Sequence, residues 1–133
     1  MKAVCDTSAL VSLFNTRDSN HEQAKDLIDV LRDRQATILL PNEIVTETVN
    51  VIGRQLGHAV AFSVSRVLLG TDFVLVETTP RIREQAFSFF RSLPDSVSFT
   101  DCLVMAVAEA FATNIIFGFD EVFRKNDYSL PTR

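Results

Sequence analysis

Four acidic residues occupy places in the sequence where a ligand-binding site is expected. Asp6 and Asp120 each follow a short hydrophobic run. Asp101 opens a nearly all-apolar helical segment, and Glu47 lies in a helix that follows another apolar run. In an open α/β sheet, ligands bind at the edge formed by the carboxyl ends of the strands. Four carboxylates there repel one another unless a hard cation, which prefers oxygen ligands, holds them together. The pattern predicts a metal site and favours metal-assisted phosphoryl chemistry.

Each acid also has a purely structural interpretation. Asp6 and Asp120 each precede a predicted helix, where aspartate is a favoured N-cap residue. Ser98 and Asp101 have the spacing of a capping box. Glu47 lies beside the apolar stripe of its helix, where a charge can simply remain in water. For any one acid this interpretation is the simpler one, but the convergence of all four positions at one end of one sheet favours the metal site.

Hydrophobic periodicity predicts strands that alternate with helices. The predicted strands cover residues 2–5, 37–40, 73–76 and 114–117. A first helix is predicted to start near residue 8, and six more are predicted over 21–34, 43–56, 58–69, 80–92, 101–113 and 121–125. This alternation implies an α/β fold with a parallel sheet covered on both faces. Neither a repeat nor a linker interrupts the chain, so residues 1–133 are expected to form one domain.

Two of the predicted helices differ in character. The helix over 43–56 has an apolar stripe that must face the sheet, which places Glu47 at the border between core and solvent. The stripe consists of Ile44, Val45, Thr48, Val49, Ile52 and Leu56. The helix that begins at Asp101 is apolar on almost every side over residues 102–108, so it is expected to lie deep in the fold.

Composition restricts the class of protein. With 133 residues, of which 47% are hydrophobic, the chain can bury roughly two thirds of its unfolded surface without disulfides. Cys5 and Cys102 lie in apolar segments and are expected to be free thiols. The formal charge of -4 argues against binding of nucleic acid by charge alone, although bound cations would reverse the local field. No signal peptide or membrane span is recognised, so a cytoplasmic location is expected.

Other catalytic arrangements fit less well. His21 and His58 are isolated and are expected on helix surfaces rather than in a zinc site. No nucleophile elbow surrounds any serine, and the chain has only four glycines and no phosphate-binding loop. Phe87, Phe89 and Phe90 cannot all face one way on a helix. They indicate either an exposed apolar surface for a partner or a wide stripe facing the core.

Four segments together resemble the PIN-domain ribonucleases, and especially the VapC-type toxins of toxin–antitoxin pairs. The segments have the order and spacing of the family, and they are residues 4–10, 41–52, 98–101 and 119–125. The resemblance implies a three-layer α/β/α fold with a mainly parallel sheet, a site that uses Mg²⁺ or Mn²⁺, and endonucleolytic cleavage of RNA. It also implies a homodimer and an antitoxin whose basic tail blocks the site.

The resemblance assigns roles to individual residues. Thr7 or Ser8 matches the small hydroxyl residue beside the first acid. Gly118 stands where family members often have Thr or Ser, which removes one hydroxyl from the site. The chain also ends soon after Leu130, so a final edge strand is expected to be short or missing. The family's catalytic and metal-binding acids correspond to Asp6, Glu47, Asp101 and Asp120.

The predicted mechanism is metal-assisted hydrolysis of an RNA phosphodiester. Asp6, Asp101 and Asp120 would hold one or two ions. Glu47 would orient the attacking water or complete the shell of a second ion. The alternatives are a DNA nuclease, a phosphatase-type hydrolase, and a catalytically silent module that binds a basic peptide or RNA through its acidic pocket. The candidate phosphate-binding cations are Arg17, Arg54, Arg66, Arg124 and Lys125.

Overall fold

A computed structural model describes the whole chain, residues 1–133, and has a parallel sheet at its centre. The sheet order is β3-β2-β1-β4, and every neighbouring pair is parallel. The chain therefore adds β2 and β3 on one side of β1 and then returns to add β4 on the other side. The strands are β1 (Lys2–Cys5), β2 (Thr37–Pro41), β3 (Val74–Val76) and β4 (Ile116–Phe117).

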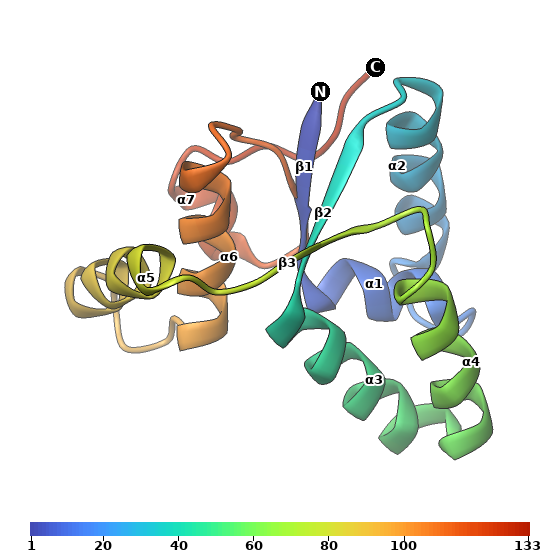
Figure 1. Ribbon diagram of the computed structural model, residues 1–133. Helices are drawn as coiled ribbons and strands as arrows, with labels where there is room; N and C mark the ends of the chain where they lie inside the picture. Colours follow the sequence, from blue (N-terminus) through green and yellow to red (C-terminus); the bar gives the residue numbers. More distant parts are fainter.

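Helices cover both faces of the sheet, as the sequence predicts (Figure 1). One layer contains α1 (Thr7–Phe14), α2 (His21–Asp33), α3 (Asn42–Leu56) and α4 (His58–Leu68). The other contains α5 (Pro80–Ser92), α6 (Phe99–Ala110) and α7 (Glu121–Lys125). The predicted three-layer α/β/α architecture is confirmed. None of these helices combines the length and the hydropathy that crossing a membrane would require.

The predicted element boundaries are correct to within a few residues, and α6 shows why they shift. Its start moves back to Phe99 because Ser98 occupies the N-cap, and its end moves back to Ala110 because Ala112 adopts a left-handed conformation with φ 55°. The strands β3 and β4 are shorter than predicted, since only Val74–Val76 and Ile116–Phe117 pair regularly with their neighbours. Local periodicity cannot show where a strand stops pairing.

A cluster of 33 buried residues joins the two helical layers through the sheet. Every residue from Cys102 to Ala108 in α6 is buried, as the all-apolar pattern predicts. On α3, Ile44, Thr48 and Ile52 are buried. Cys5 and Cys102 are both free and buried, and burial is the main cause that raises the pKa of Cys102 to about 11. These thiols belong to the core.

The C-terminal segment adds very little to the sheet beyond β4. Ile115 and Ser129 form an isolated parallel bridge, in which the Ile116 N–H donates to the Ser129 carbonyl at 2.9 Å. The expected short or missing edge strand is thus reduced to this bridge. Tyr128 anchors the segment, because its side chain is buried and its hydroxyl donates to Glu109 Oε1 at 2.7 Å.

Candidate metal centre

The order of the strands creates a site between β1 and β4. The direction of chain winding changes between these two strands, and ligands of open α/β sheets bind at such a switch point. Asp6 directly follows β1, and Asp120 follows β4 after Gly118 and Phe119. The backbone brings the two segments together, because the Asp6 N–H donates to the Phe117 carbonyl at 3.0 Å.

Asp6 is buried and held by Ser8. Only 2% of Asp6 is exposed, and its Oδ2 accepts from the Ser8 backbone N–H at 3.1 Å and from the Ser8 hydroxyl at 2.7 Å. The capping interpretation of Asp6 is therefore correct as far as it goes. The Ser8 hydroxyl also accepts from the Phe119 N–H at 2.9 Å, so it bridges the two segments of the switch point. Of the two hydroxyl residues that the sequence left open, Ser8 makes these contacts, whereas Thr7 Oγ1 is buried without a partner.

Asp101 and Asp120 differ in how far capping explains them. Asp101 forms a complete capping box with Ser98, in which Asp101 Oδ2 accepts from the Ser98 N–H at 3.3 Å. Asp120 occupies the N-cap position of α7, but its side chain makes no capping hydrogen bond. Helix capping thus accounts for the position of Asp101 but leaves the exposed carboxylate of Asp120 without a structural partner.

Three of the four predicted acids form a close group. Ligand oxygens of Asp6, Asp101 and Asp120 all lie within 4.8 Å of one another. Glu47 is half-buried on α3, as predicted, and it lines the same cavity without belonging to this group. The structure therefore brings Asp6, Asp101 and Asp120 together and places Glu47 in the wall of the cavity that they share.

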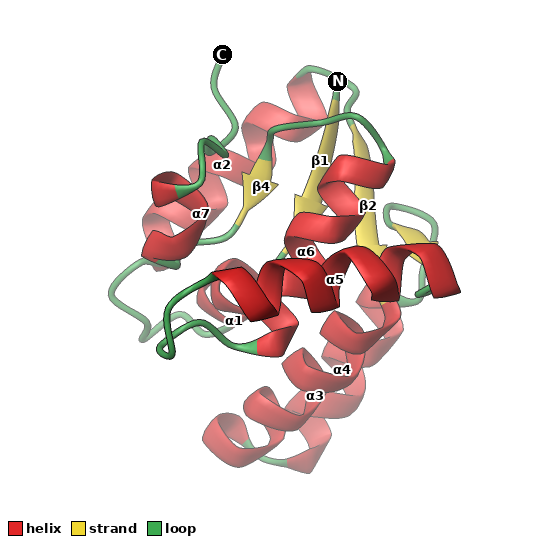
Figure 2. Cartoon of the chain, turned by 90° about the vertical axis from the view of Figure 1, so that its left-hand side faces the viewer, coloured by secondary structure: helices red, strands yellow, loops and turns green.

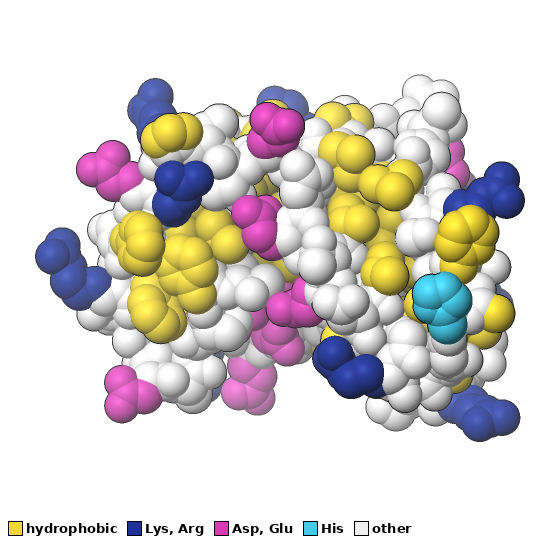
Figure 3. Space-filling view, turned by 60° about the horizontal axis from the view of Figure 1, so that its bottom comes forward, with side chains coloured by type: hydrophobic (Ala, Val, Ile, Leu, Met, Phe, Trp, Pro, Cys, Tyr) yellow, Lys and Arg dark blue, Asp and Glu magenta, His cyan; other side chains and the backbone are white.

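The acids line a cavity of about 710 Å³. Its walls include residues that the sequence analysis did not single out for the site, because nothing in their spacing marks them. They come from the loop between α5 and α6 and from α7, and they are Leu93, Pro94, Ser96, Val97, Glu121, Val122 and Asn126. In the view of Figure 3, acidic side chains run down the middle of the molecule between two groups of hydrophobic side chains.

Burial and mutual repulsion oppose ionisation of the acids. Burial is the main cause that raises the pKa of Asp6 to about 7, and the charges of Asp120 and Asp101 add to it. Burial and the charge of Asp120 also raise the pKa of Asp101. No lysine or arginine forms an ion pair with any of the three. The group therefore has a deficit of positive charge.

This donor set fits a hard divalent cation. It offers three carboxylates and no thiol or imidazole, which is the ligand chemistry of Mg²⁺ and Mn²⁺. Both hydrogen bonds to Asp6 go to Oδ2, so Oδ1 has no partner in the protein. A cation would supply the positive charge that this group of carboxylates does not receive from an ion pair.

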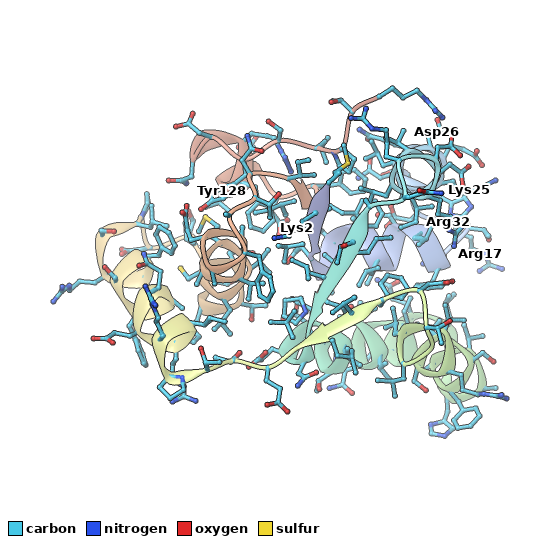
Figure 4. The ribbon with its side chains drawn as sticks, turned by 45° about the horizontal axis from the view of Figure 1, so that its top comes forward. Lys2, Arg17, Lys25, Asp26, Arg32 and Tyr128 are labelled. Atoms are coloured by element: carbon cyan, nitrogen blue, oxygen red, sulfur yellow. The ribbon has the colours of Figure 1, made fainter.

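The predicted phosphate-binding cations differ in how free they are. Arg124 is occupied within the fold, because its guanidinium donates to the carbonyls of Gly118 and Tyr128, and burial lowers its pKa. Lys125 lines the acid cavity and forms an exposed ion pair with Glu121 at 3.4 Å. Arg54 lines an adjoining depression together with Glu47. Arg17 lies with Lys25 and Arg32 on the side of the molecule opposite α5 (Figure 4).

The two histidines are outside the acid cavity. The His21 Nδ1 atom lies 2.8 Å from the Ser12 carbonyl oxygen on the half-buried face of α2. His58 is exposed at the start of α4. Neither belongs to the group of possible metal ligands, which agrees with the prediction that both lie on helix surfaces.

We expect the metal-free protein to lose stability as the pH rises. Asp6 has a raised pKa in the fold, so its contribution to stability is complete below its ordinary pKa of 3.8 and is lost as the pH rises through about 7. The loss amounts to a free energy of unfolding on the order of 4 kcal/mol. Thermal melting in a chelating buffer across this pH range measures it.

Asp6→Asn and added metal provide the controls for this pH dependence. The amide has no charge to bury, so the variant should melt at a higher temperature than the metal-free wild type near pH 8 and at a similar one near pH 4. Mg²⁺ or Mn²⁺ at a hundredfold excess over Kd should stabilise the wild type by about 2.7 kcal/mol and leave Asp6→Asn almost unchanged. A melting temperature of the wild type that changes with neither pH nor metal would contradict the proposed centre.

Comparisons with known proteins agree with this architecture. The chain is similar to the 23S rRNA-specific endonuclease VapC20 of Mycobacterium tuberculosis, with 27% identity over 119 residues, or 89% of this chain and 88% of that protein. The crystal structure of VapC20 matches with a TM-score of 0.84 at 23% identity over 96% of each chain. The structure of VapBC2 from Rickettsia felis, bound to a DNA fragment from its promoter, matches with a TM-score of 0.73 at 12% identity over 98% of this chain and 96% of that chain. The family model of the PIN domain matches residues 3–127, so the chain belongs to the PIN domain family.

Proposed function

We propose that this protein is a divalent-metal-dependent endoribonuclease and the toxin of a type II toxin–antitoxin pair. The observation that carries the proposal is the group of three carboxylates within 4.8 Å at the switch point of the sheet, none of which forms an ion pair with a lysine or arginine. The relative VapC20 is named as an rRNA-specific endonuclease, which favours RNA over DNA as the substrate class.

Each acid has a task that follows from its position. Asp6, Asp101 and Asp120 would hold Mg²⁺ or Mn²⁺, and Glu47 would orient the attacking water from the α3 wall or help to hold a second ion. A bound ion supplies Lewis acidity and lowers the pKa of water. Ser8 keeps the Asp6 carboxylate oriented, and Ser98 does the same for Asp101.

A cleavage assay tests the proposal. The protein is incubated with labelled single-stranded RNA and with DNA of the same sequence, with either Mg²⁺ or Mn²⁺ or with a chelator. We expect internal cuts in the RNA only when metal is present. Cutting of both substrates would indicate a general nuclease, whereas release of phosphate from a monoester without cuts in either strand would indicate a phosphatase. Binding of basic peptides without any cleavage would favour the binding module.

The acid cavity also suits the basic tail of an antitoxin. An arginine can form a bidentate pair with two carboxylates, which would remove the ion and block the approach of a phosphate. The VapBC2 structure, which has the same fold, is named as a VapBC assembly bound to its promoter DNA, and this name supports a partner of this kind. We further propose that the protein acts as a homodimer, a state that sedimentation of the purified chain measures directly.

Competition between the tail and metal is expected to be mutual. An arginine-containing peptide should bind less tightly as the Mn²⁺ concentration rises at constant ionic strength, because both ligands need the same carboxylates. Titration calorimetry measures the change, and the same peptide with lysine in place of arginine is the control for charge without bidentate geometry. A peptide affinity that does not respond to metal would place the inhibitor at another surface.

A further inference from the structure

The exposed side of α5 carries two large aromatic rings that the acid cavity does not use. Phe87 is 57% exposed and Phe90 is 47% exposed, whereas Phe89 of the same helix packs against the core. Figure 2 shows α5 as the outermost element of its layer, lying across α6. This arrangement decides between the two interpretations of the phenylalanine run, because two of the three rings form an exposed surface.

The two exposed rings are held in place by a third. Phe99, the first residue of α6, lies 5.0 Å from Phe87 between ring centroids and 5.5 Å from Phe90, with the second pair at 90° to each other. Phe99 itself is half-buried and packs against the core. The rings of Phe87 and Phe90 are therefore supported from beneath and keep part of their surface open to solvent.

Positive charge surrounds these rings in a protein that is acidic as a whole. Helix α5 contains three arginines, at 81, 83 and 91, against the single acid Glu84, while the chain carries a formal charge of -4. All three arginines are exposed, and the ion pairs of the structure involve other residues. A depression of about 720 Å³ is lined by Arg81, Phe87, Phe90 and Arg91, and these four residues are called the α5 platform below. Glu84 lines the same depression, so the arginines leave it with a net positive charge.

A short segment of chain joins the α5 platform to the acid cavity. The chain leaves α5 at Ser92 and enters a loop whose residues Leu93, Pro94 and Ser96 line the cavity that contains the acids. Phe99, which supports the platform, lies two positions before Asp101 on α6. The platform and the acid cavity are therefore linked by the loop after α5 and by the first turn of α6.

We infer that the α5 platform binds the single-stranded RNA that flanks the cleavage point, an inference that rests on the proposed ribonuclease function. Unstacked bases bind proteins by stacking on exposed aromatic rings, and unpaired arginines beside the rings contact the phosphates. The platform holds both kinds of group. The acid cavity has a deficit of positive charge, so affinity for the RNA backbone must come from a neighbouring surface.

A second copy of the chain fits this surface less well. A two-fold interface places the same patch of both subunits in contact. It would bring the arginines of two α5 helices together, with only one glutamate on each helix to offset them. A polyanion meets no such repulsion. The charge of α5 therefore favours nucleic acid as the occupant.

The test measures RNA binding without cleavage. Fluorescence anisotropy of a short labelled single-stranded RNA is followed in a chelating buffer with wild type, Phe87→Leu, Phe90→Leu and Arg91→Gln. Leucine keeps an apolar side chain but removes the aromatic face. We expect each leucine variant to raise Kd roughly fivefold or more at every salt concentration. Arg91→Gln should instead make the slope of log K against log salt less negative by about 0.7, the value for one lost phosphate contact on a single strand.

Matched controls exist in the opposite layer. Phe62 on α4 is 59% exposed, close to the 57% of Phe87, and it lies in the opposite layer, so Phe62→Leu should leave Kd unchanged. Arg32 is exposed and lies on the other side of the molecule from α5, so Arg32→Gln should leave the salt slope unchanged. Melting curves of all variants establish that they are folded.

The outcomes separate this inference from the proposed function. Weaker RNA binding by the α5 variants, with unchanged sedimentation, supports the platform. Unchanged RNA affinity overturns it, as does a loss of affinity that accompanies dissociation of a dimer, since the surface would then be an interface between copies. If wild type binds RNA through the platform but does not cut it with metal, the ribonuclease proposal fails and the platform stands. If wild type cuts RNA and the α5 variants bind it normally, only the platform fails.

Discussion

Asp101→Asn is expected to remove nearly all cleavage of RNA and to leave the fold almost intact. The amide keeps the shape of the side chain and an oxygen that can accept from the Ser98 N–H, but it loses the charge that a metal ion requires. Loss of one charge-stabilising group should lower the cleavage rate by roughly a hundredfold or more. Any effect on capping should cost about 1 kcal/mol at most. Single-turnover cleavage and thermal melting measure the two effects separately.

Ser98→Ala is the matched control because it removes the other half of the capping box. It deletes the hydroxyl that accepts from the Asp101 N–H at 3.0 Å and leaves the carboxylate in place. We expect a loss of about 1 kcal/mol in stability and substantial remaining cleavage. The two variants should therefore show opposite patterns. If the Asp101→Asn protein cuts RNA at the wild-type rate, the proposed role of this acid is wrong.

Gly118→Ala is expected to damage both the fold and the site. A Cβ atom at position 118 would lie 2.7 Å from Asp6 Cβ and 2.9 Å from Phe123 Cε2, distances that force the neighbours to move. Overpacking of this kind typically costs about 1–3 kcal/mol. Because Asp6 Cβ is one of the displaced atoms, metal-dependent stabilisation and cleavage should fall together with the melting temperature.

Gly53→Ala is the control for Gly118→Ala. At position 53 the nearest atom to the added carbon would be Ala61 Cβ at 3.6 Å, which is an ordinary contact, and the residue lies inside α3. Alanine is better than glycine in a helix by up to about 1 kcal/mol, so this variant should be neutral or slightly stabilised. A Gly118→Ala protein with wild-type melting and cleavage would show that Asp6 can move without loss of function.

The close contact at Gly118 also explains a departure that the sequence left unexplained. The likeness to the family suggests that glycine at this position merely removes a hydroxyl from the site. In the structure, Asp6 and Phe123 occupy the space that any side chain at position 118 would need. Introducing serine there would therefore meet the same obstruction as alanine, so a restored hydroxyl would come with a displacement of Asp6 or Phe123.

The fold class was predictable because it depends on local patterns. Strands and helices alternate with clear periods, the helix from Asp101 is apolar all round, and the acids lie just beyond apolar runs. Once the sheet is parallel, residues that follow its strands must lie at one edge, so the meeting of Asp6 with Asp120 follows from topology. The position of Glu47 at the border between core and solvent was predictable from the apolar stripe of its own helix.

The remaining features depend on contacts between segments far apart in the chain. The choice of Ser8 over Thr7 rests on the Phe119 N–H, which is 111 positions away. The sequence made Arg124 a candidate for binding phosphate, yet its guanidinium donates hydrogen bonds to the carbonyls of Gly118 and Tyr128. The loop between α5 and α6 lines the cavity because it leads into the first turn of α6, which carries Asp101. No pattern within a single segment contains this information.

The two hydrogen bonds of the Ser8 hydroxyl have a consequence for the exchange of ions. One hydroxyl joins Asp6 to the segment that carries Asp120, so the spacing of the two backbone segments is set by the protein itself. An ion that enters such a preorganised site orders few additional groups, and an ion that leaves does not release them. If the proposed centre binds metal, we therefore expect it to empty and refill with little rearrangement of the polypeptide as the surrounding ion concentration changes.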